Sequence, residues 1–90
     1  MTHGYYESKP ELIKRLNKAA GQIGGIGKMI EDDRYCIDIL TQISAVRSAL
    51  DKVALELVSD HTKHCMTETD ADKKDMKAEE LTAAIARLIK

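Results

Sequence analysis

The sequence predicts an all-α fold, a three-helix protomer with a long central helix that forms one domain over residues 1–90. Composition supports this prediction: 43% of the residues are hydrophobic, Phe and Trp are absent, and the apolar residues are mainly Leu, Ile, Val, Ala and Met, which suit helix packing better than a sheet. Apolar residues also recur three and four positions apart. Because a chain of 90 residues encloses only a small core, we expect an oligomer.

A first helix is expected from about residue 9 to residue 31. The segment Ser8–Glu11 has the pattern of a capping box, with Pro10 in the first turn. The apolar positions then follow at helical spacing: Leu12, Leu16, Ala19, Ile23, Ile26 and Ile30. Asp32 and Asp33 interrupt this pattern and are suited to cap the next helix.

A second helix is expected over about residues 34–64, which contain neither Gly nor Pro. Its apolar positions are Ile39, Ile43, Val46, Leu50, Val53 and Leu57. A helix of about 30 residues in so small a protein usually packs against a neighbouring subunit. Residues 66–75 are polar and are expected to form a linker, followed by a short third helix over about residues 76–89.

Three residues of the second helix, Cys36, His61 and Cys65, form a set of soft metal ligands. His61 and Cys65 are four positions apart, which places them on one helical face. Cys36 precedes His61 by 25 positions, or roughly 37 Å along an unbroken helix, so one protomer cannot complete the site. An antiparallel partner helix would bring its own Cys36 beside them, which predicts a dimer with two equivalent sites.

Two thiolates and one imidazole suit Cu(I), whereas Zn²⁺ requires a fourth ligand and Ni²⁺ a square-planar set of N and S ligands. His64 and His3 are the available extra ligands. Tyr35 is expected to shield the site, and a hydrogen bond to the free nitrogen of His61 is expected from Glu79, Glu80 or Glu68. Taken singly, Cys36 could equally be an inert buried thiol.

The first helix carries a basic face although the net charge of the chain is −1. At about 100° per residue, Lys14, Lys18 and Lys28 fall within a sector of roughly 80°, opposite the apolar side. Arg15 and Gln22 flank this sector and can contact phosphates or base edges. Gly21 and Gly25 lie among the lysines, where they allow close approach of a phosphate backbone or of another helix. An ordinary solvated face is the alternative, and an oligomer would multiply the patch. No helix-turn-helix signature is present.

Several classes of function are excluded or disfavoured. The start of the chain lacks the pattern of a signal peptide, and no apolar run reaches the roughly 18 residues of a membrane span, so a cytoplasmic protein is expected. In that compartment two cysteines indicate metal binding or reactivity rather than a structural disulfide. No Cys-x-x-Cys, catalytic triad order or glycine-rich cofactor loop supports an enzyme, and no small organic substrate is expected. A copper buffer or chaperone without DNA-binding activity is the rival from another class.

With Cys36, His61 and Cys65 on this helical plan, the chain resembles the copper-sensitive operon repressor family of bacterial metal sensors over residues 8–90. The resemblance also rests on Gly21-Gln22 after Arg15, on Gln42-Ile43 and on Ala45-Val46-Arg47. It implies an antiparallel dimer, a dimer-of-dimers tetramer, operator binding by the metal-free protein and release of DNA on metal binding.

Carried over to this sequence, the resemblance implies that Cys36 of one protomer and His61 with Cys65 of its partner hold Cu(I), with Tyr35 and a glutamate of the third helix, Glu80, around them. It also implies that Arg15, Gln22 and Arg47 face DNA, although Arg47 could instead pair with Asp51 one turn on. Nickel/cobalt sensors of the same family are the alternative, which His3 leaves open.

Overall fold

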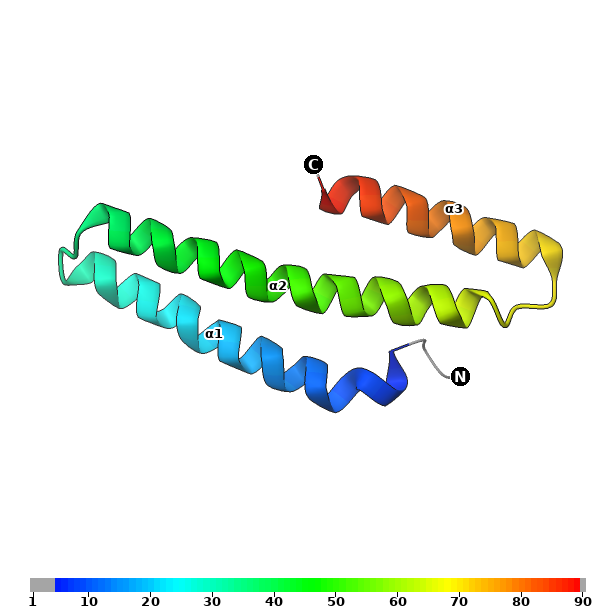
Figure 1. Ribbon diagram of the computed structural model, residues 1–90, viewed down its shortest axis with the longest axis horizontal. Coiled ribbons are helices and arrows are strands. Elements are labelled where there is room, and N and C mark those ends of the chain that lie inside the picture. The colour runs from blue at the N-terminus through cyan, green and yellow to red at the C-terminus, as the bar shows by residue number, and fades with distance from the viewer. Residues whose placement is uncertain (1–4, 90) are drawn as a thin grey trace. The chain divides into compact units, whose positions relative to one another are not determined.

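The computed structural model describes residues 5–89, which form a short 3₁₀ helix over Tyr6–Ser8 and the helices α1 (Lys9–Glu31), α2 (Cys36–Cys65) and α3 (Ala71–Leu88) (Figure 1). These residues contain no β-strand. The predicted all-α class with a long central helix is therefore confirmed.

The chain divides into two compact units, of which the first comprises residues Glu7–Leu55. In this unit α1 lies antiparallel beside the first part of α2 (Figure 1). Its buried residues are Leu12 and Ala19 of α1 and Val46 and Val53 of α2, each at most 6% exposed. These four positions belong to the apolar patterns of the sequence, so hydrophobic spacing alone identified the inner faces of both helices.

Helix α1 has the predicted bounds, but the predicted capping box is wrong in detail. Ser8 precedes the helix with backbone angles that are already helical, φ −85° and ψ −7°, and its side chain makes no capping hydrogen bond. The reason is the 3₁₀ turn over Tyr6–Ser8, which leads directly into α1. A capping side chain requires an extended backbone at that position.

The turn between α1 and α2 explains why α2 begins at Cys36 rather than at about residue 34. Asp32 ends α1, with its N–H donating to the carbonyl oxygen of Lys28 at 2.9 Å, instead of capping the next helix. Asp33 follows with φ 55°, a left-handed conformation that aspartate tolerates. The next helix then starts with the N–H of Ile39 donating to the carbonyl oxygen of Tyr35 at 3.2 Å.

The second unit comprises Met1–Tyr6 and Glu56–Lys90, and within it α3 folds back alongside the C-terminal part of α2 (Figure 1). Helix α3 begins at Ala71, earlier than the predicted start at about residue 76. The Asp70 side chain caps it by accepting hydrogen bonds from the N–H groups of Asp72 and Lys73, at 3.0 and 3.2 Å. The cap stabilises a first turn whose polar sequence resembled a linker.

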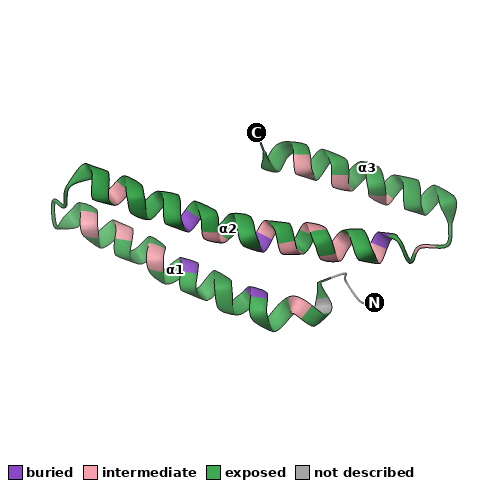
Figure 2. Cartoon of the chain, viewed as in Figure 1, coloured by how far each residue is buried: buried purple, intermediate pink, exposed green. Residues whose placement is uncertain are grey.

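The enclosed core is small, as Figure 2 shows by the few buried positions on α1 and α2, whereas the described residues of α3 include none. Within residues 5–89 the buried hydrophobic side chains are the four named above and Cys65. Along the apolar stripe of α2, Ile43, Leu50 and Leu57 remain 38–42% exposed. An apolar surface of this extent in so short a chain is characteristic of subunits that associate. None of the helices in the described part is long and apolar enough to cross a membrane.

Candidate metal centre and nucleic-acid interface

The predicted metal ligands lie at the two ends of α2. Cys36 is the first residue of the helix and is exposed, whereas Cys65 is its last residue and is 8% exposed. His61 precedes Cys65 by one turn and is half-buried. Both thiols are free. Two thiols and an imidazole are a suitable donor set for a soft metal ion.

The described residues show no complete set of these donors in one place. In residues 5–89, no three His, Cys, Asp or Glu side chains come together as a group that could hold a metal ion. Cys36 belongs to the unit Glu7–Leu55, whereas His61 and Cys65 belong to the unit that contains α3. The described residues therefore supply no third ligand of this kind beside His61 and Cys65.

His61 lines a pocket of about 600 Å³ whose other walls come from α2, α3 and the N-terminal segment. The apolar part of the pocket consists of Leu57, Val58, Leu81, Ala83 and Ala84. Its polar groups belong to Tyr5, Glu80 and Arg87 in addition to His61. Tyr5 and Arg87 did not emerge from the sequence analysis, because residues so far apart in the chain are related only by the fold.

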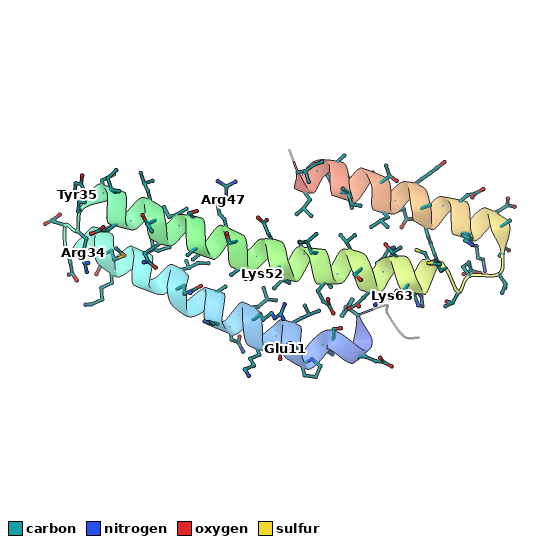
Figure 3. The ribbon with its side chains drawn as sticks, in the orientation of Figure 1. Glu11, Arg34, Tyr35, Arg47, Lys52 and Lys63 are labelled. Atoms are coloured by element: carbon teal, nitrogen blue, oxygen red, sulfur yellow. The ribbon has the colours of Figure 1, made fainter. Side chains whose placement is uncertain are left out.

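The remaining residues predicted around the metal are placed as follows. Glu80 shares the pocket with His61, whereas Glu79 is exposed and Glu68 pairs with Lys77 at 2.9 Å. Of the three candidate glutamates, Glu80 is therefore the one that lines the same pocket as His61. Tyr35 is 68% exposed at the turn before α2 (Figure 3), so it shields nothing within one chain. His64 is half-buried in the last turn of α2, and His3 lies outside the described residues.

A basic groove of about 310 Å³ lies between α1 and α2 in the unit Glu7–Leu55. Arg15, Lys18 and Gln22 of α1 line one wall, and Ser48 and Lys52 of α2 line the other. The structure thus brings together three of the predicted DNA-facing residues. Lys52 lines the same groove, and sequence analysis did not single it out because it is near the α1 residues only through the antiparallel pairing of the helices.

Gln22 and Arg15 differ in their local partners. Gln22 is half-buried, and its Oε1 atom has no hydrogen-bond partner in the described part of the chain. Arg15 Nε lies 3.4 Å from Glu11 Oε1 in an exposed pair one turn apart. Such surface pairs contribute about 0–1 kcal/mol, so the guanidinium can exchange this carboxylate for a phosphate at small cost.

The other predicted DNA-facing residues are exposed on the helices. Lys14 and Lys18 are exposed on α1, and Lys28 Nζ lies 4.0 Å from Asp32 Oδ2. Arg47 is exposed on α2 and points away from α1 in Figure 3. Within the described residues Arg47 and Asp51 form no ion pair, so the guanidinium is available for an external anion.

The glycines of α1 do not serve packing inside the chain. A Cβ atom built at any of them meets no atom within 4 Å, and none has a positive φ: Gly21, Gly24, Gly25 and Gly27. Their conformational freedom is therefore not required by α1 itself. Both sequence interpretations, approach by a phosphate backbone and approach by a helix of another chain, therefore stay open.

Comparison with known proteins identifies the family. The family model described as metal-sensitive transcriptional repressor matches residues 8–87. The chain is 52% identical over 91 residues to the copper-sensing transcriptional repressor RicR of Mycobacterium tuberculosis. The aligned region covers 98% of this chain and 95% of that protein. The crystal structure of the copper-sensing repressor CsoR with Cu(I) from Geobacillus thermodenitrificans is similar with a TM-score of 0.81 and 39% identity, over 93% of this chain and 88% of that one. The nickel-responsive transcriptional regulator InrS is similar with a TM-score of 0.73 and 35% identity, over 87% of this chain and 89% of that one. The chain therefore belongs to the family of metal-sensitive transcriptional repressors.

Proposed function

We propose that this chain is a cytoplasmic Cu(I)-responsive repressor that binds operator DNA without metal and releases it when Cu(I) binds. The observation that carries the proposal is the donor set on α2, two free thiols and one imidazole, with His61 and Cys65 one turn apart. The likeness to RicR and to CsoR with Cu(I) supports copper as the effector. Membership of the family implies operator binding and oligomerisation, and its members are repressors rather than enzymes.

The proposed metal site is shared between two protomers of an antiparallel dimer. His61 and Cys65 come from one protomer and Cys36 from the partner subunit. The exposure of Cys36 and Tyr35 supports this arrangement, because both are accessible to a second chain. The pocket at His61 offers an apolar wall for Tyr35 of the partner subunit, and Glu80 is the group for the second nitrogen of His61.

The proposed DNA surface combines the basic groove with the lysines of α1. Arg15, Lys18, Gln22 and Lys52 line the groove, and Lys14, Lys28 and Arg47 extend the surface. Each chain supplies few cations, but a dimer-of-dimers tetramer repeats them four times. Affinity for DNA rises with the number of phosphates neutralised, so the tetramer is the form expected to bind the operator.

Repression then depends on a coupling free energy between the metal and DNA sites. Such couplings are typically about 1–3 kcal/mol, and they are reciprocal, so Cu(I) weakens DNA binding as much as DNA weakens Cu(I) binding. The thiolates must be deprotonated to bind metal, so Cu(I) affinity is expected to fall with acidity.

The decisive experiment tests the shared site by subunit mixing. A Cys36→Ser variant and a His61→Ala/Cys65→Ser variant each lack a complete site. In a mixed dimer one complete site forms, from Cys36 of the second variant and His61 with Cys65 of the first. Neither variant alone should bind Cu(I) tightly, whereas the mixture should regain up to one tight site per mixed dimer and part of the DNA release. No recovery, under conditions in which native mass spectrometry shows exchange of subunits, contradicts the shared site.

Two alternatives are separated by simple measurements. The likeness to InrS favours a nickel-responsive repressor as the second candidate, with His64 or His3 as additional ligands. Loading with Cu(I) or Ni(II) followed by X-ray absorption distinguishes them, since a three-coordinate S₂N site with copper supports the main proposal. A copper buffer without DNA function predicts that Lys14→Glu/Lys18→Glu leaves all activity intact, whereas a repressor loses operator binding.

A further inference from the structure

The loop between α2 and α3 is tied to the last turn of α2, which carries the ligand Cys65. The N–H of Glu68 donates to the carbonyl oxygen of Cys65 at 3.1 Å, and Thr67 Oγ1 donates to the carbonyl oxygen of His64 at 2.7 Å. The loop therefore follows any displacement of the α2 end.

Glu68 connects this loop to α3. Its Oε2 atom accepts a hydrogen bond from Lys77 Nζ at 2.9 Å, and its Oε1 atom accepts one from the N–H of Asp70 at 3.1 Å. The two side chains are 20% and 33% exposed. Unlike the pair of Arg15 and Glu11, which lies on one turn of one helix, this pair joins two elements. We call it the Glu68–Lys77 clasp.

The electrostatic surroundings of the clasp connect it with both parts of the candidate metal centre. The hydrogen bond from Lys77 holds the pKa of Glu68 below its ordinary value of 4.5, and the same bond raises the pKa of Lys77 above 10.5. Coulombic interactions with Cys65 and with Glu80 add to the rise in the pKa of Lys77. Lys77 is thus within electrostatic range of a ligand and of the glutamate that shares a pocket with the second ligand, His61.

We propose that the Glu68–Lys77 clasp is a positioning device that makes α3 move with the Cys65 end of α2, so that occupancy of the metal centre is passed on to α3. The inference rests on the proposed function. Helix α3 carries Glu80 and Arg87 into the His61 pocket, so its position decides what surrounds that ligand. Coupling between the metal site and the DNA site requires an element whose position both sites influence. The clasp connects α3 to the metal site.

The test compares Glu68→Gln and Lys77→Met with matched controls, Glu79→Gln and Lys74→Met. The controls remove the same charges from exposed positions of α3 outside the clasp. For each variant, fluorescence anisotropy gives the affinity for operator DNA without and with Cu(I), and competition with a chromophoric chelator gives the affinity for Cu(I). Hydrogen exchange of the amides of residues 71–80 reports whether α3 is held.

In Glu68→Gln, we expect faster hydrogen exchange in α3 and an affinity of the metal-free protein for DNA within about twofold of the original. The factor by which Cu(I) weakens DNA binding should fall by about threefold to tenfold. Lys77→Met should lower that factor similarly, and both controls should leave it unchanged. The charge-reversed double variant Glu68→Lys/Lys77→Glu should restore part of the factor, which a merely structural role of either residue would not predict.

Two results overturn the inference. Unchanged exchange in α3 would show that the clasp does not hold the helix, and an unchanged ratio of affinities together with faster exchange would show that α3 plays no part in coupling. Failure of the proposed function is distinct, since the unaltered protein would then keep its DNA when Cu(I) fills the site.

Discussion

Replacing Gly21 and Gly25 by Ala should stabilise the protein and weaken its binding to DNA at the same time. Both glycines lie inside α1, where the sequence places them among the lysines of the basic face. A methyl group added at either position meets no atom of the chain within 4 Å, and neither residue has a positive φ. The substitution is therefore compatible with the fold.

The magnitude follows from helix propensity. Glycine in a helix interior is less favourable than alanine by about 1 kcal/mol, so the double variant should gain about 2 kcal/mol if the two sites are independent. Where a phosphate backbone approaches the bare helix closely, the same methyl groups create overlap. An overlap that costs about 1–3 kcal/mol corresponds to a loss of DNA affinity of at least about fivefold.

Gly27→Ala is the matched control, because Gly27 lies about 100° around α1 from the nearest of the three basic-face lysines, Lys14, Lys18 and Lys28. It should stabilise the protein by about 1 kcal/mol and leave DNA affinity unchanged. Urea unfolding at fixed protein concentration gives the stabilities, and fluorescence anisotropy gives the affinities. If Gly21→Ala/Gly25→Ala binds operator DNA as tightly as the unaltered protein, the glycine surface does not touch DNA. If it loses stability, another chain covers these positions.

Four further predictions concern single positions. Asp33→Gly should raise the free energy of unfolding by up to about 1 kcal/mol in urea titrations, because glycine adopts the φ of 55° at this turn without strain; a decrease would contradict this. Lys52→Ala should weaken binding to DNA of any sequence. It should also make the plot of log affinity against log salt concentration less steep, by about 0.9 for each phosphate that the protein no longer neutralises. An unchanged slope would show that Lys52 does not contact DNA. Glu11→Gln should tighten DNA binding, since it frees Arg15 from its carboxylate partner, and equal affinities would show that the pair is irrelevant. The lowered pKa of Glu68 contributes stability that is present above the unfolded-state value of 4.5 and lost as the pH falls through the folded-state value, so acid should loosen α3 in hydrogen exchange. Glu68→Gln should reduce this dependence and leave the part that the Asp70 cap contributes.

Periodicity predicted most of the fold, whereas the ligand set, which side-chain chemistry indicated, stays a prediction. The spacing from Leu12 to Ile30 fixed α1, and the absence of Gly and Pro indicated that α2 continues to the region of His61 and Cys65. These features are local, since a helix and its faces are determined by residues a few positions apart.

Features that depend on distant pairing were not predictable in this way. The first turns of α3 are polar and follow no apolar period, so their helical state depends on the side chain of Asp70. The proximity of Lys52 to Arg15 depends on the antiparallel pairing of α1 and α2, and the pair of Glu68 and Lys77 depends on the path of a loop. None of these leaves a repeating signal in the sequence.

The scarcity of enclosed apolar side chains has a consequence for how the cell maintains this protein. A chain that leaves Leu50 and Leu57 about 40% exposed gains stability from association, and mass action then ties its folded population to its abundance. Each tenfold dilution of a dimer costs about 1.4 kcal/mol of that stability. Copies that have not yet associated are therefore expected to be the form that proteases cleave most readily.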